Sequence, residues 1–234
     1  SIYEENKQFF ENSLNLKKNI LKVFKRTLSV KNVTEYLKKI SRTESDSDTF
    51  ASYIYFNNYL YDWSQSDYLE NSQILDNKLI KYPTKELLNF VSRKDEKIKL
   101  GFISSDIRSK HSVTYFLRTL ISNYDKNKFK IYLYHNHDVE DDTTKEFEKY
   151  VFKSLRISKL DDIEAINAIR KDEINIVIDL NGLSSNHRLN LLKNRLAPIQ
   201  ILWCGYTNTC GLTEVDYLMV DKNLIKPNEE KFYS

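Results

Sequence analysis

The residues best suited to chemistry lie in one short polar loop between two apolar segments. Ser105, Asp106 and Arg108 follow a short apolar run, and His111 directly precedes an amphipathic run. An imidazole has an unperturbed pKa of about 6.5, so it exchanges a proton readily near neutral pH. The loop therefore predicts a site that binds a polar molecule, with His111 as a base or as a hydrogen-bond donor to a substrate oxygen.

These residues also have purely structural interpretations. His111 can cap the helix that follows it, and Asp106 can form a local ion pair with Arg108 that shapes the loop. For Asp106 and Arg108 we favour the ion pair. Two further histidines, His135 and His137, are two positions apart, but no third ligand is near in sequence. We interpret them as the end of a strand rather than as a metal site.

Polar residues follow two later apolar runs as well. The run at 174–180 includes Asp179, and the run at 199–204 leads into a loop with two glycines. The carboxyl ends of parallel strands meet at one edge of a sheet, where such folds bind ligands. We therefore expect these segments to join His111 in one site. Its candidate binding residues are, in chain order, Ser105, Asp106, Asn181, Gly182, Gly205, Tyr206, Thr209 and Gly211.

Sequence patterns of three common enzyme classes do not occur in the chain. The first strand is not followed by GxGxxG, and neither the phosphate-binding GxxxxGK[ST] nor the nucleophile pattern GxSxG is found. Their absence argues against a dinucleotide dehydrogenase, a nucleotide hydrolase with a phosphate-binding loop, and an esterase with a nucleophile elbow.

The elements that must position the candidate residues alternate in type after residue 97. Continuous β-branched runs such as INIVIDL are typical of strands that are covered on both faces. The alternation predicts an α/β fold with a doubly wound, Rossmann-like parallel sheet. Strands are expected at 98–104, 129–134, 152–157, 174–180, 199–204 and 216–220, and helices at 112–123, 143–150, 161–171 and 187–195.

The first part of the chain has a different character. All four glycines lie after residue 100, and Pro83 is the only proline before that point. Segments with few turn residues are typical of helices. We expect antiparallel helices, with periodic apolar residues at 3–26, 31–41, 50–61 and 64–80, and a polar linker or helix start at 41–49. The predicted division is a helical segment, 1–95, and an α/β lobe, 96–234.

Composition narrows the protein class. A hydrophobic share of 41% in 234 residues indicates a globular chain with a sizeable core. A net charge of +3 gives no argument for nucleic acid or for an anionic membrane. The sequence has no apolar run of about 18 residues and no signal peptide, so we expect a cytoplasmic protein. Cys204 and Cys210 match no zinc pattern and are expected to be free thiols.

Four segments of the lobe resemble a known family in the right order and spacing. They are LGFISSDIRSKHSVTYFL, FKIYLYHN, INIVIDLNG and LAPIQILWCGYTNTCGLTEVDYLMVD. Together they look like the first catalytic half of the O-GlcNAc transferase / SPINDLY family, glycosyltransferase family 41. The stretch from Ser52 to Leu79 resembles the helical segment that precedes this half, and residues 1–45 resemble, weakly, a tetratricopeptide-type (TPR) remnant.

The resemblance implies the first lobe of a GT-B enzyme that transfers a sugar with inversion. The implied donor is UDP-N-acetylglucosamine, and the implied acceptor is Ser or Thr of a protein. His111 matches the active-site histidine in the loop after the first strand, while the Asn181-Gly182 loop and the Gly205–Gly211 loop would line the cleft between lobes. Neither a metal nor a cofactor is expected.

The sequence also departs from the family pattern. Leu183-Ser184 stand where His or Tyr followed by Thr is common, which would remove a polar contact. The C-terminal lobe, which holds most of the donor site in this family, is not in the sequence. We therefore expect the chain alone to be inactive. Transfer of fucose to Ser/Thr, transfer of hexose to Asn, and a non-catalytic scaffold of the same fold remain alternatives.

Overall fold

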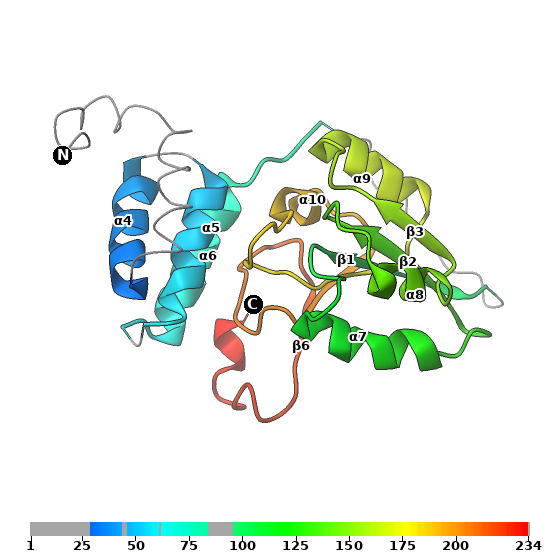
Figure 1. The fold of residues 1–234 in the computed structure, drawn as a ribbon. Helices are drawn as coiled ribbons and strands as arrows, with labels where there is room; N and C mark the ends of the chain where they lie inside the picture. The colour runs from blue at the N-terminus through cyan, green and yellow to red at the C-terminus, as the bar shows by residue number, and fades with distance from the viewer. Residues whose placement is uncertain (1–28, 44–45, 61, 84–95, 234) are drawn as a thin grey trace.

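A six-stranded, all-parallel sheet forms the centre of the part of the chain that the structure describes (Figure 1). The computed structural model describes residues 29–43, 46–60, 62–83 and 96–233. The strand order is β3-β2-β1-β4-β5-β6, so the chain winds outward from β1 in both directions. The strands are β1 (Ile98–Ser104), β2 (Phe129–His135), β3 (Lys153–Arg156), β4 (Ile176–Asp179), β5 (Ile199–Trp203) and β6 (Tyr217–Met219). The predicted α/β fold is confirmed, and each predicted strand corresponds to an observed one.

Successive residues of the central strands are buried on opposite faces of the sheet. Phe102 and Ile178 belong to one hydrophobic cluster, whereas their neighbours Ile103 and Val177 belong to another. All four side chains are at most 6% exposed. This double burial explains why the strands read as continuous apolar runs rather than as alternating ones.

Helices cover both faces of the sheet (Figure 1). α7 (Ser112–Asn123) and α8 (Asp142–Glu148) contribute to the first cluster, and α9 (Asp162–Lys171) and α10 (Leu189–Lys193) contribute to the second. Capping boxes at Asp141 and Asp161 fix the starts of α8 and α9. α10 is shorter than the predicted helix at 187–195, because Arg188 at its N-cap has a φ of −129° and a ψ of 54°, and Arg195 has a φ of +49°, and neither conformation is helical.

Among the residues that the structure describes, three helices precede the sheet: α4 (Val30–Thr43), α5 (Ser47–Asn57) and α6 (Gln65–Lys78). α5 begins three residues before the predicted start, because the side chain of Asp46 caps the N–H of Thr49. The predicted helix at 3–26 and the division between residues 95 and 96 concern segments outside the described residues. A single hydrophobic cluster contains Leu37, Ile54 and Leu75 together with residues of the lobe.

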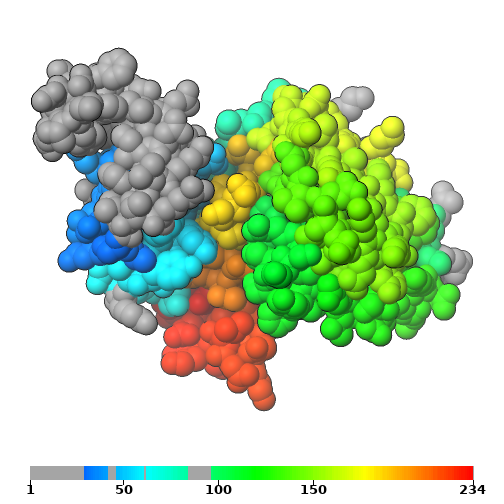
Figure 2. Space-filling model, viewed as in Figure 1, coloured from blue at the N-terminus to red at the C-terminus, as the bar shows by residue number. Residues whose placement is uncertain are grey.

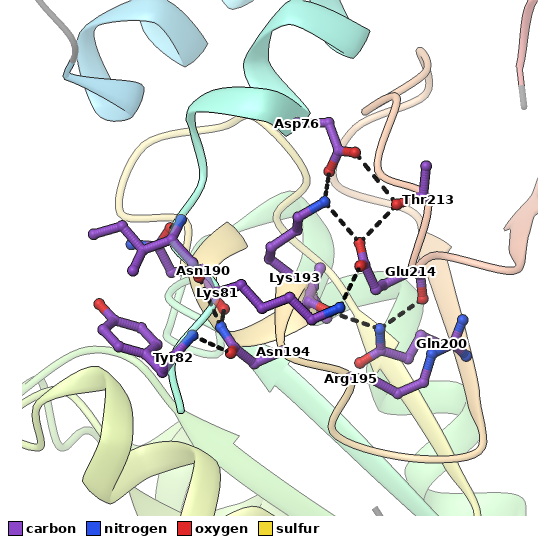
Figure 3. A network of polar contacts seen from close by, with 12 residues as sticks. Asp76, Lys81, Tyr82, Asn190, Lys193, Asn194, Arg195, Gln200, Thr213 and Glu214 are labelled. Atoms are coloured by element: carbon purple, nitrogen blue, oxygen red, sulfur yellow. Dashed lines mark hydrogen bonds and ion pairs between the residues drawn. The ribbon is translucent and has the colours of Figure 1, made fainter. Parts of the chain in front are cut away.

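The segments that follow β4 and β5 fill the space between α5–α6 and the rest of the lobe (Figure 2). A buried ion-pair network closes this junction (Figure 3). Lys193 of α10 lies 2.8 Å from Asp76 of α6 and 3.2 Å from Glu214. Thr213 donates to both carboxylates. We call Asp76, Lys193 and Glu214 the latch, because they join the helical segment to the lobe.

Candidate functional site

The loops after β1 and β4 lie side by side at the carboxyl edge of the sheet. The two strands pair in parallel, with Ile103 opposite Asp179 at the end of the ladder. The residues that follow each strand therefore enter the same region, as the sequence predicts. We call Ser105, Asp106, His111, Asp179, Asn181 and Gly182 the rim.

The amide of Asn181 holds the two loops together. Its Oδ1 accepts a hydrogen bond from the backbone N–H of Ser105 at 2.8 Å. Its Nδ2 donates to Ser105 Oγ at 2.7 Å, to Asp106 Oδ2 at 2.9 Å and to Ser184 Oγ at 3.1 Å. Asn181 is 2% exposed, so these bonds replace water that the buried amide has lost. The Asp106 carboxylate is thereby fixed in position.

The carboxylate of Asp179 holds the loop that carries Asn181. Its Oδ2 accepts hydrogen bonds from the backbone N–H groups of Asn181 at 3.2 Å and Gly182 at 2.6 Å. Burial raises the pKa of Asp179 to about 7, the two N–H donors work in the opposite direction, and the nearby charge of Asp106 adds to the increase. The sheet edge thus holds two neighbouring carboxyl groups, of which Asp179 has the perturbed pKa that is common at functional sites.

His111 lies at the start of α7 with its imidazole beside Asp106. It occupies the N-cap position but makes no side-chain capping hydrogen bond. Its Nε2 lies 3.5 Å from Asp106 Oδ1, and its buried Nδ1 has no hydrogen-bond partner among the described residues. Arg108 lies 3.6 Å from the same carboxylate oxygen, so the favoured local ion pair is present. The pair nevertheless leaves Asp106 in reach of His111, so one carboxylate serves both residues.

Of the four candidates after β5, two support the rim from behind. Tyr206 is 7% exposed and packs against Gly182, which has a φ of +52°. A Cβ at Gly182 would lie 2.6 Å from the Tyr206 Cβ, so only glycine fits there. Gly205 contacts the backbone of Leu180, where an added Cβ would lie 1.8 Å from the carbonyl oxygen.

The other two candidates, Thr209 and Gly211, face the helical segment. The hydroxyl of Ser72 on α6 donates to the Thr209 carbonyl at 3.4 Å, and a Cβ at Gly211 would lie 2.5 Å from the Ser72 Cβ. The structure therefore brings five of the predicted residues together in the rim, with Gly205 and Tyr206 behind them, and places Thr209 and Gly211 against α6. A direct role for Thr209 and Gly211 in binding stays a prediction.

Two residues with a part in this arrangement are not on the list of candidate binding residues. Asp179 is expected at this edge of the sheet, because a carboxylate ends an otherwise apolar strand run, but it is not assigned a binding role. Asn58 of the α5 C-cap bonds to Tyr206 and Asn208 in the loop after β5. In the sequence, Asn58 stands out only by its position at the end of an aromatic helix. Its hydrogen bond to Tyr206 joins residues 148 positions apart, and no local sequence pattern predicts such a contact.

The other histidines and the cysteines lie outside the rim. His135 ends β2 as predicted, and burial lowers its pKa to about 4. Its ring centroid lies 5.5 Å from that of His137. Among the described residues, His, Cys, Asp and Glu form no group of three or more that could bind a metal. Cys204 and Cys210 are free thiols, as expected. No helix in the described ranges combines the length and apolarity that crossing a bilayer requires.

Comparison with known proteins gives matches of three kinds. The model of the family described as "Glycosyl transferase family 41" matches residues 64–234. The "Probable UDP-N-acetylglucosamine--peptide N-acetylglucosaminyltransferase SPINDLY" of Arabidopsis thaliana is 34% identical over 138 residues, which are 57% of this chain and 15% of that protein. The "UDP-N-acetylglucosamine--peptide N-acetylglucosaminyltransferase" of Caenorhabditis elegans is 28% identical over 136 residues, or 56% of this chain and 12% of that protein.

A solved structure has a closely similar fold. A mutant O-GlcNAc transferase of Thermobaculum terrenum superposes with a TM-score of 0.85 at 23% identity, over 94% of this chain and 42% of that one. The chain therefore spans less than half of that structure and about a seventh of the curated relatives it matches. The fold likeness extends over both the helical segment and the sheet.

Proposed function

The chain belongs to glycosyl transferase family 41, and we propose that it forms one lobe of a protein glycosyltransferase of the O-GlcNAc transferase type. The proposed donor is UDP-N-acetylglucosamine, and the proposed acceptor is a Ser or Thr hydroxyl of a protein. The printed names of the curated relatives support this donor and a peptide acceptor. Donor binding is proposed to require a second lobe, so the chain alone is expected to transfer no sugar.

The proposed reaction is an inverting substitution at the anomeric carbon of the sugar. The acceptor oxygen forms a bond to that carbon while the bond from the carbon to the nucleotide diphosphate breaks. The hydroxyl proton passes to the imidazole of His111, and the diphosphate leaves with the bonding electrons. The carboxylate of Asp106, 3.5 Å from Nε2, stabilises the imidazolium that this transfer creates. In the alternative role, His111 only orients the acceptor hydroxyl by a hydrogen bond.

The observation that carries the proposal is the combination of His111 and Asp106 at the carboxyl edge of the sheet. Nε2 of His111 lies 3.5 Å from a carboxylate that Asn181 holds in place, and the His111 side chain is 30% exposed. A general base needs an orienting group beside it and access for the substrate hydroxyl. The membership in family 41 supports the reaction class, and the rim contains groups that could bind and deprotonate the acceptor hydroxyl.

The direct test is a panel of nucleotide sugars with the full-length protein and a mixture of acceptor proteins. We expect transfer from UDP-N-acetylglucosamine, with the sugar found on Ser or Thr by mass spectrometry. Transfer of fucose to Ser/Thr or of hexose to Asn would overturn the proposed donor and keep the enzyme class. The same panel with the 234-residue chain alone is expected to give no product, and transfer by it would contradict the need for a second lobe.

Absence of transfer with every donor would favour a non-catalytic scaffold. The sequence feature behind this alternative is Leu183, which stands where a polar residue is common in the family. In the structure Leu183 is 2% exposed and packs in the core that the lobe shares with the helical segment. Because Leu183 is buried, it does not give the rim an exposed apolar surface to which a partner could bind. The structure therefore does not favour a scaffold role over an enzymatic one.

A further inference from the structure

Asn58 connects the helical segment to the loop after β5 through both ends of its amide. It lies at the C-cap of α5, and its Nδ2 donates to the hydroxyl of Tyr206 at 3.2 Å. Its Oδ1 accepts from Nδ2 of Asn208 at 3.0 Å. The Nδ2 also donates to the helix carbonyls of Ile54 and Tyr55, so the amide is held from the helix side as well. Asn58 thereby fixes two residues of the loop relative to α5.

Tyr206 passes this constraint on to the loop after β4. The ring is 7% exposed and lies against the backbone of Gly182 so closely that even one added methyl group would overlap it. Burial raises the pKa of the Tyr206 hydroxyl, which keeps it protonated and dependent on a protein partner. A shift of the ring would therefore move Gly182 or open a gap beside it.

Gly182 and Asn181 are neighbours in a loop whose backbone is held by Asp179. Asn181 in turn determines the position of Asp106, and Asp106 faces His111. The contacts from Asn58 to the imidazole thus form a continuous series of packed or hydrogen-bonded groups. Each step joins residues that are buried, apart from Asn58 and His111 at the two ends.

We infer that Asn58 is a positioning residue for the rim, which acts on His111 through Tyr206 and the Asn181–Gly182 loop. The helical segment then contributes to the geometry of the site and does more than precede the lobe in sequence. For turnover the inference rests on the proposed function, but the placement of His111 can be measured without it. A displacement of the imidazole should reduce the rate more than it reduces donor affinity, because Asn58 acts on the acceptor side.

The test compares Asn58→Ala, Tyr206→Phe and the double variant by proton NMR of the full chain. With only four histidines, the His111 ring signals can be assigned. We expect both single variants to shift the His111 ring resonances, and the double variant to add little, because both single variants remove the same link. In the full-length protein, kcat should fall about tenfold with little change in donor KM.

Asn77→Ala provides the matched control. Asn77 also donates its amide to a carbonyl four residues earlier in its own helix, at 3.1 Å, but it lies on the exposed side of α6. It should leave the His111 signal and kcat unchanged. If Asn58→Ala does not fold, Tyr206→Phe decides, since it removes only the hydroxyl by which Asn58 holds the ring in position. An unmoved His111 signal in a folded Tyr206→Phe variant would overturn the inference, whether or not the full-length protein transfers sugar.

Discussion

The latch and the rim are both clusters of buried charged and polar groups, but they differ in how their charges are paired. In the latch, Lys193 lies between two carboxylates, and its bonds to them raise its pKa against the opposing effect of burial. In the rim, Asp179 is held by backbone N–H groups only, and burial raises its pKa to about 7. His111 lies 3.5 Å from the Asp106 carboxylate with its side chain 30% exposed.

This difference indicates that the polar groups of the latch and of the rim have different roles. A latch that joins two parts of a chain is most stable when every charge meets its opposite. A site that binds and deprotonates a substrate needs groups whose hydrogen bonds are incomplete until the substrate arrives. The electrostatics therefore support assigning stability to the latch and chemistry to the rim. The following variants test that assignment, from the larger expected effect to the smaller.

Lys193→Met should destabilise the protein most. It leaves Asp76 without a counter-charge and Glu214 with only the exposed Lys81, at carboxylate side-chain exposures of 8% and 15%. Removing one partner of a buried pair costs about 3 kcal/mol or more. Urea unfolding should show this loss in free energy of unfolding.

Lys81→Met is the matched control, because Lys81 lies 3.7 Å from Glu214 but is 73% exposed. We expect this variant to lose about 0.5 kcal/mol or less of its free energy of unfolding. Equal losses in the two variants would contradict the role given to the latch.

Asp179→Asn should change how stability depends on pH. The folded-state pKa of Asp179 is raised, so the native protein keeps a proton that the unfolded chain has already lost. This contribution to stability is complete below the unfolded pKa and is lost as the pH rises toward about 7. From about pH 5 to about pH 6.5 the natural protein should lose about 2 kcal/mol relative to Asp179→Asn.

Urea unfolding of both proteins across this range measures the difference. His135, whose pKa is lowered to about 4, changes stability in the opposite direction, but it is present in both proteins and cancels. If the free energy of unfolding depended on pH in the same way in both proteins, Asp179 would be ionised throughout this range. The rim would then hold a charged carboxylate, as the latch does.

The sheet could be predicted from sequence because its signals are local. Each strand is an apolar run bounded by polar or turn residues, and burial on both faces makes such runs continuous, as at Val177 and Ile178. The predicted helix ends were less exact, since capping by Asp46 and the non-helical backbone of Arg188 and Arg195 decide them. These contacts depend on individual side chains rather than on periodicity.

The site could be predicted only in part, for a related reason. That the loops after β1 and β4 converge follows from the parallel topology, so Ser105, Asp106 and Asn181 could be grouped from sequence. That the Asn181 amide bridges the other two could not, because it depends on side-chain placement across 75 and 76 residues. The contact of Thr209 with α6 was missed because the predicted division treated the helical segment and the lobe as separate parts.

The central claim is that the rim is the acceptor side of a sugar-transfer site, with His111 in direct contact with the reacting hydroxyl. The most direct measurement is the steady-state rate of His111→Ala in the full-length protein, with His187→Ala as the matched histidine control. We predict that kcat for transfer to a protein acceptor falls about 100-fold or more in His111→Ala, while donor KM and the free energy of unfolding stay close to those of the natural protein. Transfer by folded His111→Ala at the rate of the His187→Ala control would contradict the claim.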